Sequence, residues 1–334
     1  MKSKKITKAV TLFLMAVLAI SLIYVFFTQR EIDDGTIYIR LGHDQPVNNE
    51  RHIALVKFEE LVEERSDGKI QVEIYPNGLL GTEAVLLESV SFNDMEMVST
   101  SSTSQFGSLI SVFELPYLFD TYQDAWSVLD GEIGREVADY YLKDNLKLIA
   151  YYENGFRQIT SNRVIHSPDD LNGLKIRTPE FPISIRTFNA LGANPTPMGF
   201  SELYTALQQG TVDAQENPVA NAYTNKFQEV QRYMIMSNHQ YMPQHLHISN
   251  EFFEGLDPEY QKIILDAAQE GADYHRQLLR ENEARMIAEL EEDGMEIIEV
   301  DMEQFSALVD PVYEWFAGLH GEEIIERIRQ ANKP

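Results

Sequence analysis

The sequence predicts a two-lobed α/β protein in which one long helix spans both lobes. Short apolar strands alternate with amphipathic helices along the chain, an order typical of sheets covered by helices. The 334 residues exceed the length of ~250–300 at which single cores stop growing, which favours two domains. Asp257-Pro258 opens a helical segment that runs to about Leu290, far beyond the usual ~11 residues.

The elements of the first half follow from short periodic patterns. Ile70, Val72 and Ile74 alternate with polar residues, as in a strand with one buried face, after a turn at Ser66-Asp67-Gly68. The expected strands are Thr36–Gly42, Lys69–Tyr75, a short one near Met95–Ser99, and Lys147–Tyr152, and the expected helices are Glu50–Arg65 and Thr82–Val90. Asn154-Gly155 is expected to form a turn directly after the last of these strands.

The second half repeats this alternation. Ser167-Pro168-Asp169-Asp170 has the pattern of a helix start, with Ser as the N-cap and Pro at the first helical position. Ser201 is expected to cap a helix that ends before Gly210. The expected strands are Leu174–Thr178, Val212–Gln215 and Tyr233–Ser237, with Asn217 in a turn closed by Pro218.

Composition and charge exclude several classes of function. The formal net charge is −26, and the acidic surface repels the phosphates of nucleic acids, so no nucleic-acid partner is expected. The chain has no cysteine, which excludes a thiol nucleophile, a Cys-ligated zinc and a lipid anchor on an N-terminal cysteine. The acidic surface also repels anionic solutes at long range. A binding site for an anion must therefore be a local arginine pocket.

Residues 1–30 form an N-terminal membrane anchor or signal segment. Lys2 to Lys8 are basic, and Ala9 to Phe27 carry no charge over nineteen residues. This length is close to the ~20 residues that span a bilayer and exceeds the ~7–15 of a cleaved signal core. The positive-inside rule places everything after Arg30 outside the cell. We expect an uncleaved anchor, with a cleaved signal peptide as the alternative.

Several segments resemble one family of transport receptors. They are Asn154–Arg157 (NGFR), Leu174–Pro179 (LKIRTP), Leu191–Gln209 (LGANPTPMGFSELYTALQQ) and Val212–Pro218 (VDAQENP), with Leu61–Pro76 and Phe113–Phe119 (FELPYLF) upstream. Together they resemble the solute receptors of TRAP (tripartite ATP-independent) transporters, of the dicarboxylate-binding type, over residues 36 to about 320. One departure is Ala214, where the family usually has Gly, and its methyl group could narrow the pocket.

The resemblance implies a periplasmic-binding-protein-like clamshell that captures a small organic acid. Lobe I is expected at residues 36–155 plus 243–280, and lobe II at 156–242 plus 281–330. The solute is expected to be a sugar acid such as a hexuronate, or a four-carbon dicarboxylate, delivered to a TRAP permease in the membrane. Transport in that family is driven by an ion gradient, so no cofactor is expected.

The resemblance also implies the main ligand contacts. Arg177, at the end of a short strand, is the carboxylate clamp of the family, because a guanidinium offers two parallel donors to a carboxylate. Arg157 is expected to assist it, Phe200 to stack on the ligand, and Asn217 to donate and accept hydrogen bonds. Each has a structural alternative: an ion pair for Arg177, a hinge salt bridge for Arg157, a hydrophobic staple for Phe200 and a turn for Asn217.

The first lobe should supply the opposing wall of the cleft. Its candidate residues follow strands or open helices, where α/β sheets place ligands. They are His43, Asn48, Asn49, Glu83 and Ser101, the last within the hydroxyl-rich run Ser99–Ser104. Glu83 and that run are the best candidates for binding hydroxyl groups, and caps or turns are the alternative roles.

No catalytic pattern stands out, so the protein is expected not to be an enzyme. There is no G-x-S-x-G elbow, no glycine-rich nucleotide loop and no H-E-x-x-H motif. His239, His245 and His247 are interpreted as strand residues, and no metal site is expected. A receptor of an ATP-driven importer and an extracellular enzyme acting on sugar acids are the alternative functions.

Overall fold

The computed structural model describes residues 35–332. Residues from Tyr38 onward form one compact unit. None of the helices between residues 35 and 332 combines the length and the apolar character needed to cross a membrane. The predicted anchor or signal segment at residues 1–30 lies outside the described residues.

The strands of residues 35–332 form a single nine-stranded mixed sheet. They are β1 (Ile37–Gly42), β2 (Ile70–Tyr75), β3 (Met97–Thr100), β4 (Leu146–Ser161), β5 (Lys175–Thr178), β6 (Asn194–Pro197), β7 (Ala214–Pro218), β8 (Tyr233–Ser249) and β9 (Glu296–Glu299). Their order is β2-β1-β3-β8-β4-β7-β5-β6, with β9 beside β8. The two long strands β4 and β8 therefore connect a first end of the sheet (β2, β1, β3) with a second end (β7, β5, β6).

Strands β4 and β8 are much longer than the sequence predicted. They pair antiparallel from Leu146 with Ser249 to Ser161 with Tyr233. The predicted turn at Asn154-Gly155 is wrong, because β4 continues through it, and Gly155 takes φ 101° at a register shift in the pairing. The left-handed φ at this position favours glycine. Asn217 likewise lies in β7, paired with Gln158 of β4, and the predicted turn there is wrong.

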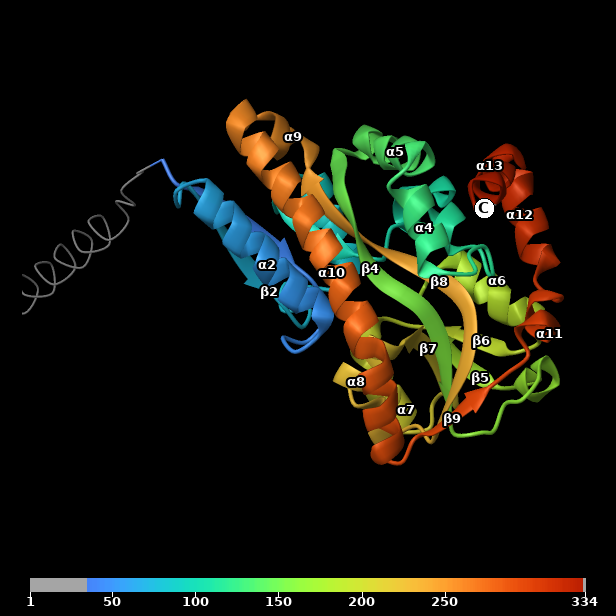
Figure 1. Ribbon diagram of the computed structural model, residues 1–334. Coiled ribbons are helices and arrows are strands. Elements are labelled where there is room, and N and C mark those ends of the chain that lie inside the picture. The colour runs from blue at the N-terminus through green and yellow to red at the C-terminus, as the bar shows by residue number, and fades with distance from the viewer. Residues whose placement is uncertain (1–34, 333–334) are drawn as a thin grey trace, which may run out of the picture. The chain divides into compact units, whose positions relative to one another are not determined.

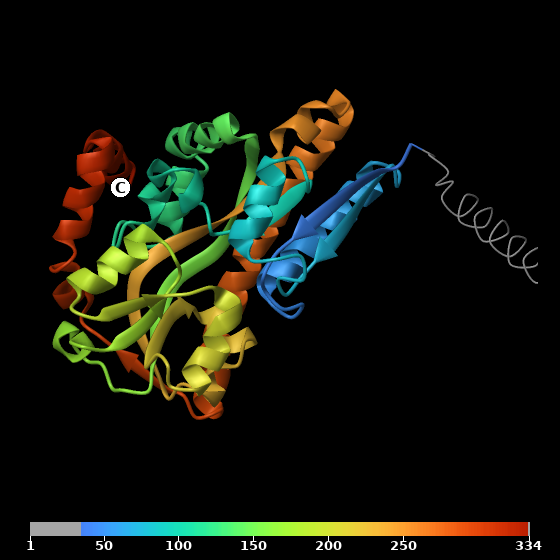
Figure 2. The same cartoon turned by 180° about the vertical axis from the view of Figure 1, so that it is seen from behind.

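Helices cover the sheet at both ends. The first half supplies α2 (Glu50–Arg65), α3 (Glu83–Ser91), α4 (Tyr122–Leu129) and α5 (Glu132–Asp139). The second half supplies α6 (Pro182–Ala190), α7 (Phe200–Gln208), α8 (Val219–Thr224), α9 (Asn250–Glu254), α10 (Pro258–Glu292), α11 (Met302–Ser306), α12 (Asp310–His320) and α13 (Glu323–Ala331). Figures 1 and 2 show α11–α13 on the side of the sheet away from α2 and α3.

The predicted long helix is confirmed as α10, which has 35 residues. It begins with Pro258 at the first helical position, where the missing N–H of proline has no intrahelical partner to lose. It contacts α2 near the first end of the sheet, β4 in the middle and α8 near the second end (Figure 1). One helix thus contacts elements at both ends of the sheet.

The helix starts were predicted with mixed success. Glu50–Arg65 has the predicted bounds, and Thr82 caps α3 through its side chain, which accepts from Val85 N–H. Ser167 forms a capping box with Asp170, although the segment that it opens is a single 3₁₀ turn. The predicted cap at Ser201 is wrong, because α7 already begins at Phe200.

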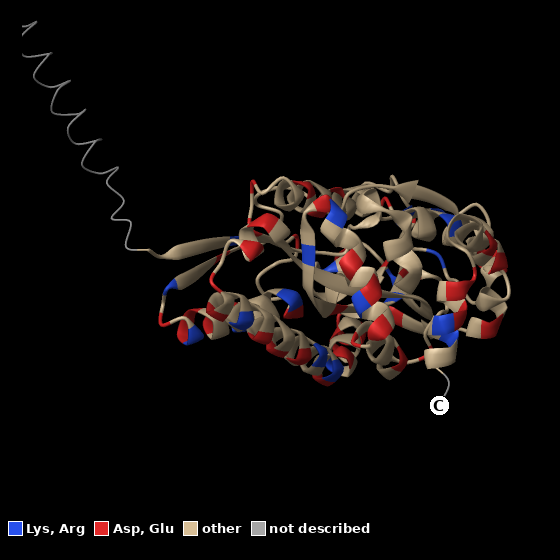
Figure 3. Ribbon diagram, turned by 90° about the horizontal axis from the view of Figure 1, so that it is seen from above, with Lys and Arg blue, Asp and Glu red and all other residues tan. Residues whose placement is uncertain are grey.

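The acidic residues that produce the net charge of −26 lie mainly on the outer surfaces of the helices (Figure 3). Apolar side chains fill the space between these helices and the sheet. Examples are Phe113, Phe188 and Phe316, which are fully buried in the largest apolar cluster. The buried charged groups of residues 35–332 are therefore exceptions to the pattern, and several of them gather at one cavity.

Gly271→Ala is expected to lower the free energy of unfolding by about 1–3 kcal/mol. Gly271 of α10 packs against Tyr152 of β4, and an added methyl group would meet the buried Tyr152 hydroxyl at a distance that carbon does not tolerate. The matched control is Gly318→Ala in α12, where no atom lies within 4 Å of the added carbon. That variant should gain up to ~1 kcal/mol of helix propensity. Urea unfolding measures both, and equal shifts would contradict this packing.

Candidate functional site

A cavity of about 490 Å³ lies between the two ends of the sheet. It is built where β1, β3 and β5 reach their carboxyl ends, the position at which α/β sheets place ligands. Its charged lining residues are Asp44, Arg51, Glu83, Arg157, Arg177 and Glu180. Among the predicted ligand contacts, the structure brings Arg177, Arg157, Asn217, Phe200, Glu83 and Ser101 to this cavity.

Arg177 is a buried cation without an anionic partner. Its side chain extends from β5, and its Nε and Nη2 atoms donate to the carbonyl oxygen of Met198 at 3.1 and 2.8 Å. Within residues 35–332 it forms no ion pair, and its Nη1 atom makes no hydrogen bond. Burial lowers the pKa of Arg177 to about 10. A buried charge without a counterion is costly, so the cavity favours an anion at this position.

Arg157 is held differently, by a buried carboxylate. Its Nε and Nη2 atoms bond both carboxylate oxygens of Glu216 on β7, and Nη2 also donates to the Glu216 carbonyl at 2.7 Å. Glu216 further contacts His239 Nε2 at 3.2 Å. Burial opposes ionisation of Glu216, but the charge of Arg157 and the hydrogen bonds from His239 and Arg157 together lower the pKa of Glu216. Arg157 therefore lines the cavity with its charge already compensated.

Phe200 and Asn217 line the same part of the cavity as Arg177. The ring of Phe200 lies 5.9 Å from Arg177 Cζ and 6.3 Å from the ring of Phe227. Asn217 donates to Gln215 Oε1 at 2.6 Å and accepts from Asn221 Nδ2 at 3.2 Å. Aromatic faces and amides at one wall suit a ligand that has both carbon–hydrogen and polar surfaces.

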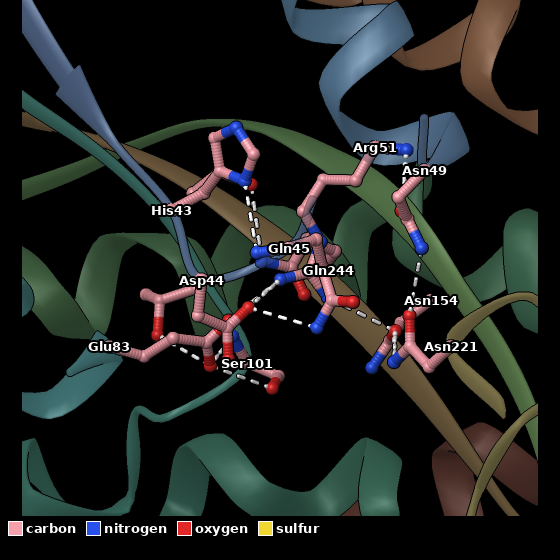
Figure 4. A network of polar contacts seen from close by, with 12 residues as sticks. His43, Asp44, Gln45, Asn49, Arg51, Glu83, Ser101, Asn154, Asn221 and Gln244 are labelled. Atoms are coloured by element: carbon pink, nitrogen blue, oxygen red, sulfur yellow. Dashed lines mark hydrogen bonds and ion pairs between the residues drawn. The ribbon is translucent and has the colours of Figure 1, made fainter. Parts of the chain in front are cut away.

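Two acidic side chains, Asp44 and Glu83, lie around Arg51 in the cavity wall formed by the first end of the sheet. Arg51 of α2 donates through one atom, Nη1, to Asp44 Oδ1 at 2.9 Å and to Glu83 Oε1 at 2.8 Å (Figure 4). The other oxygen of Glu83 accepts from Ser101 N–H and Oγ, both at 3.0 Å, and from Thr100 Oγ1 at 3.2 Å. Ser101 is thus near the ligand space but donates to Glu83.

The pKa values of the two acids move in opposite directions. Burial, together with the negative charge of Glu83, raises the pKa of Asp44. Burial also opposes ionisation of Glu83, but the charge of Arg51 and the hydrogen bonds from Ser101 lower the pKa of Glu83 overall. Glu83 therefore ionises at lower pH than Asp44, whose pKa of about 7 makes it mainly negative only above that pH.

Amide side chains connect the two ends of the sheet beside the cavity. Asn49, the N-cap of α2, donates to Asn221 Oδ1 at 3.2 Å and to Thr224 Oγ1 at 3.0 Å, both on α8. Asn154 of β4 accepts from Arg51 Nη2 at 3.1 Å and from Asn221 Nδ2 at 3.3 Å (Figure 4). These contacts join residues far apart in sequence across the cavity.

Three predicted contacts do not line the cavity. His43 is fully buried against α2, where its Nε2 atom lies 3.0 Å from His52 Nδ1, and burial lowers its pKa to about 2. Asn48 is exposed, whereas its neighbour Asn49 is buried and bonds α8. In both places a neighbouring residue is in contact with the cavity or the opposite wall instead: Asp44 lines the cavity, and Asn49 bonds α8.

The sequence patterns did not predict a place in the ligand site for Asp44, Arg51, Asn154, Asn221 or Glu216. Asp44 follows a predicted strand and Arg51 lies in the first turn of a predicted helix, positions that could have indicated a site. The histidines are strand residues, as interpreted: His245 and His247 are buried on β8 with their rings 5.8 Å apart. The described part of the chain contains no group of three His, Asp or Glu side chains placed to hold a metal ion.

Comparison with known proteins gives matches over most of the chain. Residues 41–318 match the family described as bacterial extracellular solute-binding protein, family 7. The 2,3-diketo-L-gulonate-binding periplasmic protein YiaO of Escherichia coli (strain K12) is 35% identical over 283 residues, covering 83% of this chain and 86% of that protein.

Solved structures of similar proteins contain sugar acids. The sugar acid binding protein DctPAm from Advenella mimigardefordensis strain DPN7T, in complex with galactonate, is 34% identical with a TM-score of 0.86, covering 90% of this chain and 99% of that one. A TRAP periplasmic solute binding protein from Polaromonas sp. JS666, bound to D-erythronate, is 33% identical with a TM-score of 0.85, covering 88% and 98%.

Proposed function

The chain belongs to the family 7 bacterial extracellular solute-binding proteins, and from this membership we propose that it captures a small hydroxylated acid at Arg177. It is an extracytoplasmic solute receptor of the TRAP type, with the two-lobed α/β fold of that group. This membership favours the TRAP receptor over a receptor of an ATP-driven importer or an extracellular enzyme. Members of the family are transport receptors, and we assign no catalytic step to this chain.

The uncompensated charge of Arg177 carries this proposal. A ligand carboxylate supplies the missing counterion, and the free Nη1 atom supplies one donor to it. Phe200 then contacts the carbon chain next to the carboxylate, and Asn217 binds a neighbouring hydroxyl group. Arg157 contributes through its fixed position beside Glu216, with its charge shared between ligand and protein.

The rest of the lining supports a sugar acid as the ligand. Asn154, Asn221, Asn225 and Ser102 line the cavity with groups that bind hydroxyls. The similar proteins named above bind 2,3-diketo-L-gulonate, galactonate and D-erythronate, which are acids with several oxygen groups along the chain. We infer that this receptor takes an acid of the same kind, and a four-carbon dicarboxylate is the alternative.

Capture requires the two lobes to close on the ligand. We place lobe I at residues 36–155 plus 243–280 and lobe II at residues 156–242 plus 281–330. The register shift of β4 and β8 between Glu153 and Gly155, opposite Met242 and Pro243, supports a hinge at these boundaries. The hydrogen bonds that Asn221 makes with Asn49 and with Asn154 would then form in the closed state.

The proposed partners are a TRAP permease and the membrane. The closed receptor docks on the permease and releases the acid to it. Residues 9–27, outside the described part of the chain, keep the receptor at the outer face of the membrane through their uncharged sequence.

A thermal-shift screen of the purified protein tests this function. The panel is sugar acids, dicarboxylates, neutral sugars and amino acids. A ligand at 100 times its Kd adds about 2.7 kcal/mol to the free energy of unfolding, which raises the melting temperature by several degrees. We expect sugar acids to stabilise the protein. Stabilisation by neutral sugars or amino acids alone would contradict the proposed function.

A further inference from the structure

We propose that Asp44, held beside Glu83 by Arg51, selects acids whose far end is an uncharged hydroxyl group and rejects acids with a second carboxylate there. This inference rests on the proposed function, because it requires the first carboxylate of the ligand to lie on Arg177. It assigns the far end of the ligand to the wall formed by the first end of the sheet (Figure 4).

Two of the three cations that line the cavity in the described part of the chain are already paired with carboxylates of the protein. Arg51, Arg157 and Arg177 are its three cationic lining residues within residues 35–332. Arg51 bonds two carboxylates and the Asn154 amide, and Arg157 is paired with Glu216. Arg177 alone among them lacks an ion pair. The cavity therefore provides a counterion for one ligand carboxylate and not for two.

Asp44 is better placed than Glu83 to accept a hydrogen bond from a ligand. Glu83 accepts hydrogen bonds on both oxygens, from Arg51 on one and from Thr100 and Ser101 on the other. Asp44 receives its bonds from Arg51 and from Gln45, at 2.9 and 3.0 Å, on Oδ1. Within residues 35–332 no donor bonds its Oδ2 atom, so a ligand hydroxyl can donate there, although Asp44 also lies within hydrogen-bond reach of Glu83. The Asp44 side chain is also the more exposed of the two acids, at 17% against 10%.

A hydroxyl group fits beside Asp44 better than a carboxylate does. A ligand hydroxyl donates to a carboxylate oxygen and carries no charge into the wall. A ligand carboxylate has no donor, and it would place a third negative group beside two acids that share one arginine. Like charges in a desolvated site repel strongly, and such repulsion is a common source of discrimination between ligands. Asp44 therefore acts as a specificity-determining residue.

Two pairs of acids that differ only at the far end test this inference. D-Erythronate and meso-tartrate have four carbons each, and D-galactonate and galactarate have six. Within each pair the second acid carries a carboxylate in place of the terminal alcohol. Calorimetric titration of the full-length chain in detergent at pH 8, above the Asp44 pKa of about 7, gives the four Kd values. For the pair whose length fits the cavity, we expect the wild type to bind the alcohol-ended acid at least about 100-fold more tightly.

Asp44→Asn should reduce that preference by at least about tenfold, because the amide removes the repelling charge and can donate to a carboxylate. The matched control is Glu88→Gln on α3, which removes one exposed negative charge outside the cavity lining. That control should keep the wild-type preference. Asp44→Ser provides a second test with a smaller side chain if Asp44→Asn does not fold.

The outcomes separate this inference from the proposed function. If the wild type binds the diacid as tightly as its alcohol-ended partner, the inference is wrong although the receptor function stands. The same holds if both Asp44 variants keep the full preference. If none of the four acids binds and neutral sugars or amino acids do, the proposed function itself fails.

Discussion

Arg177→Ala is expected to lower the affinity for the ligand acid by about 2–5 kcal/mol, roughly 30-fold to several-thousand-fold. The substitution removes the one lining arginine of residues 35–332 that has no carboxylate partner, so the ligand carboxylate would be buried without a counterion. Arg177→Lys should recover part of the loss, because an ammonium keeps the charge but lacks the planar set of donors that bonds the Met198 carbonyl and a ligand at the same time. Titration calorimetry with the acid that stabilises the protein most gives both values.

The ligand-free variant should keep its stability within a few degrees of melting temperature. Arg177→Ala removes a costly unpaired charge but also two hydrogen bonds to the Met198 carbonyl, and the two effects oppose each other. Arg163→Ala is the matched control, because Arg163 is exposed and does not line the cavity. Its ligand affinity should equal that of the wild type. A ligand that binds Arg177→Ala with wild-type affinity would show that its carboxylate lies elsewhere.

The sequence predicted the local elements better than their lengths. Glu50–Arg65 was predicted to the residue, because its apolar periodicity and Asn49 cap are local signals. By contrast, β4 and β8 extend well beyond the predicted strands Lys147–Tyr152 and Tyr233–Ser237. Their continuation depends on pairing with each other, so hydrogen bonds between distant segments override the local turn signal at Asn154-Gly155.

In the candidate site, too, residues with a local sequence signal were predicted and residues that depend on distant partners were not. Arg177, Phe200 and Asn217 come from distinctive motifs, and each of them lines the cavity. The wall from the first end of the sheet has no such motif, and its chemistry arises from pairs such as Arg51 with Glu83, 32 positions apart. A side chain that acts through a distant partner gives no local signal. Which of the neighbours His43 and Asp44 lines the cavity likewise depends on contacts with distant residues.

Glu114→Gln is expected to change how the stability of the protein depends on pH. Glu114 ends the 3₁₀ segment Ser108–Glu114, is 2% exposed, and its Oε2 atom has no hydrogen-bond partner within the described residues. Burial raises the pKa of Glu114 from 4.5 to about 8; the charge of Arg157 opposes this rise, and the charge of Glu216 adds to it. The folded protein therefore keeps this proton at pH values where the unfolded chain has lost it.

The sign of the effect follows from this difference in bound protons. Between pH 4.5 and about 8 the folded state holds one more proton at Glu114 than the unfolded state. Rising pH therefore costs the wild type about 1.4 kcal/mol per pH unit from this group. The stabilising contribution is complete below pH 4.5 and is lost as the pH rises through about 8. Glutamine does not titrate, so Glu114→Gln should be free of this loss.

Urea unfolding of the wild type and the variant at pH 5, 6, 7 and 8 measures the difference directly. The difference in unfolding free energy should move in favour of Glu114→Gln by about 3.5 kcal/mol over this range. Glu114→Met is the matched control for packing, because it also lacks a titrating group but cannot form hydrogen bonds of amide strength. Its difference from the wild type should have the same slope with a different offset. Parallel wild-type and variant profiles would mean that Glu114 ionises in the folded state as it does in the unfolded chain, and that a polar group compensates its charge.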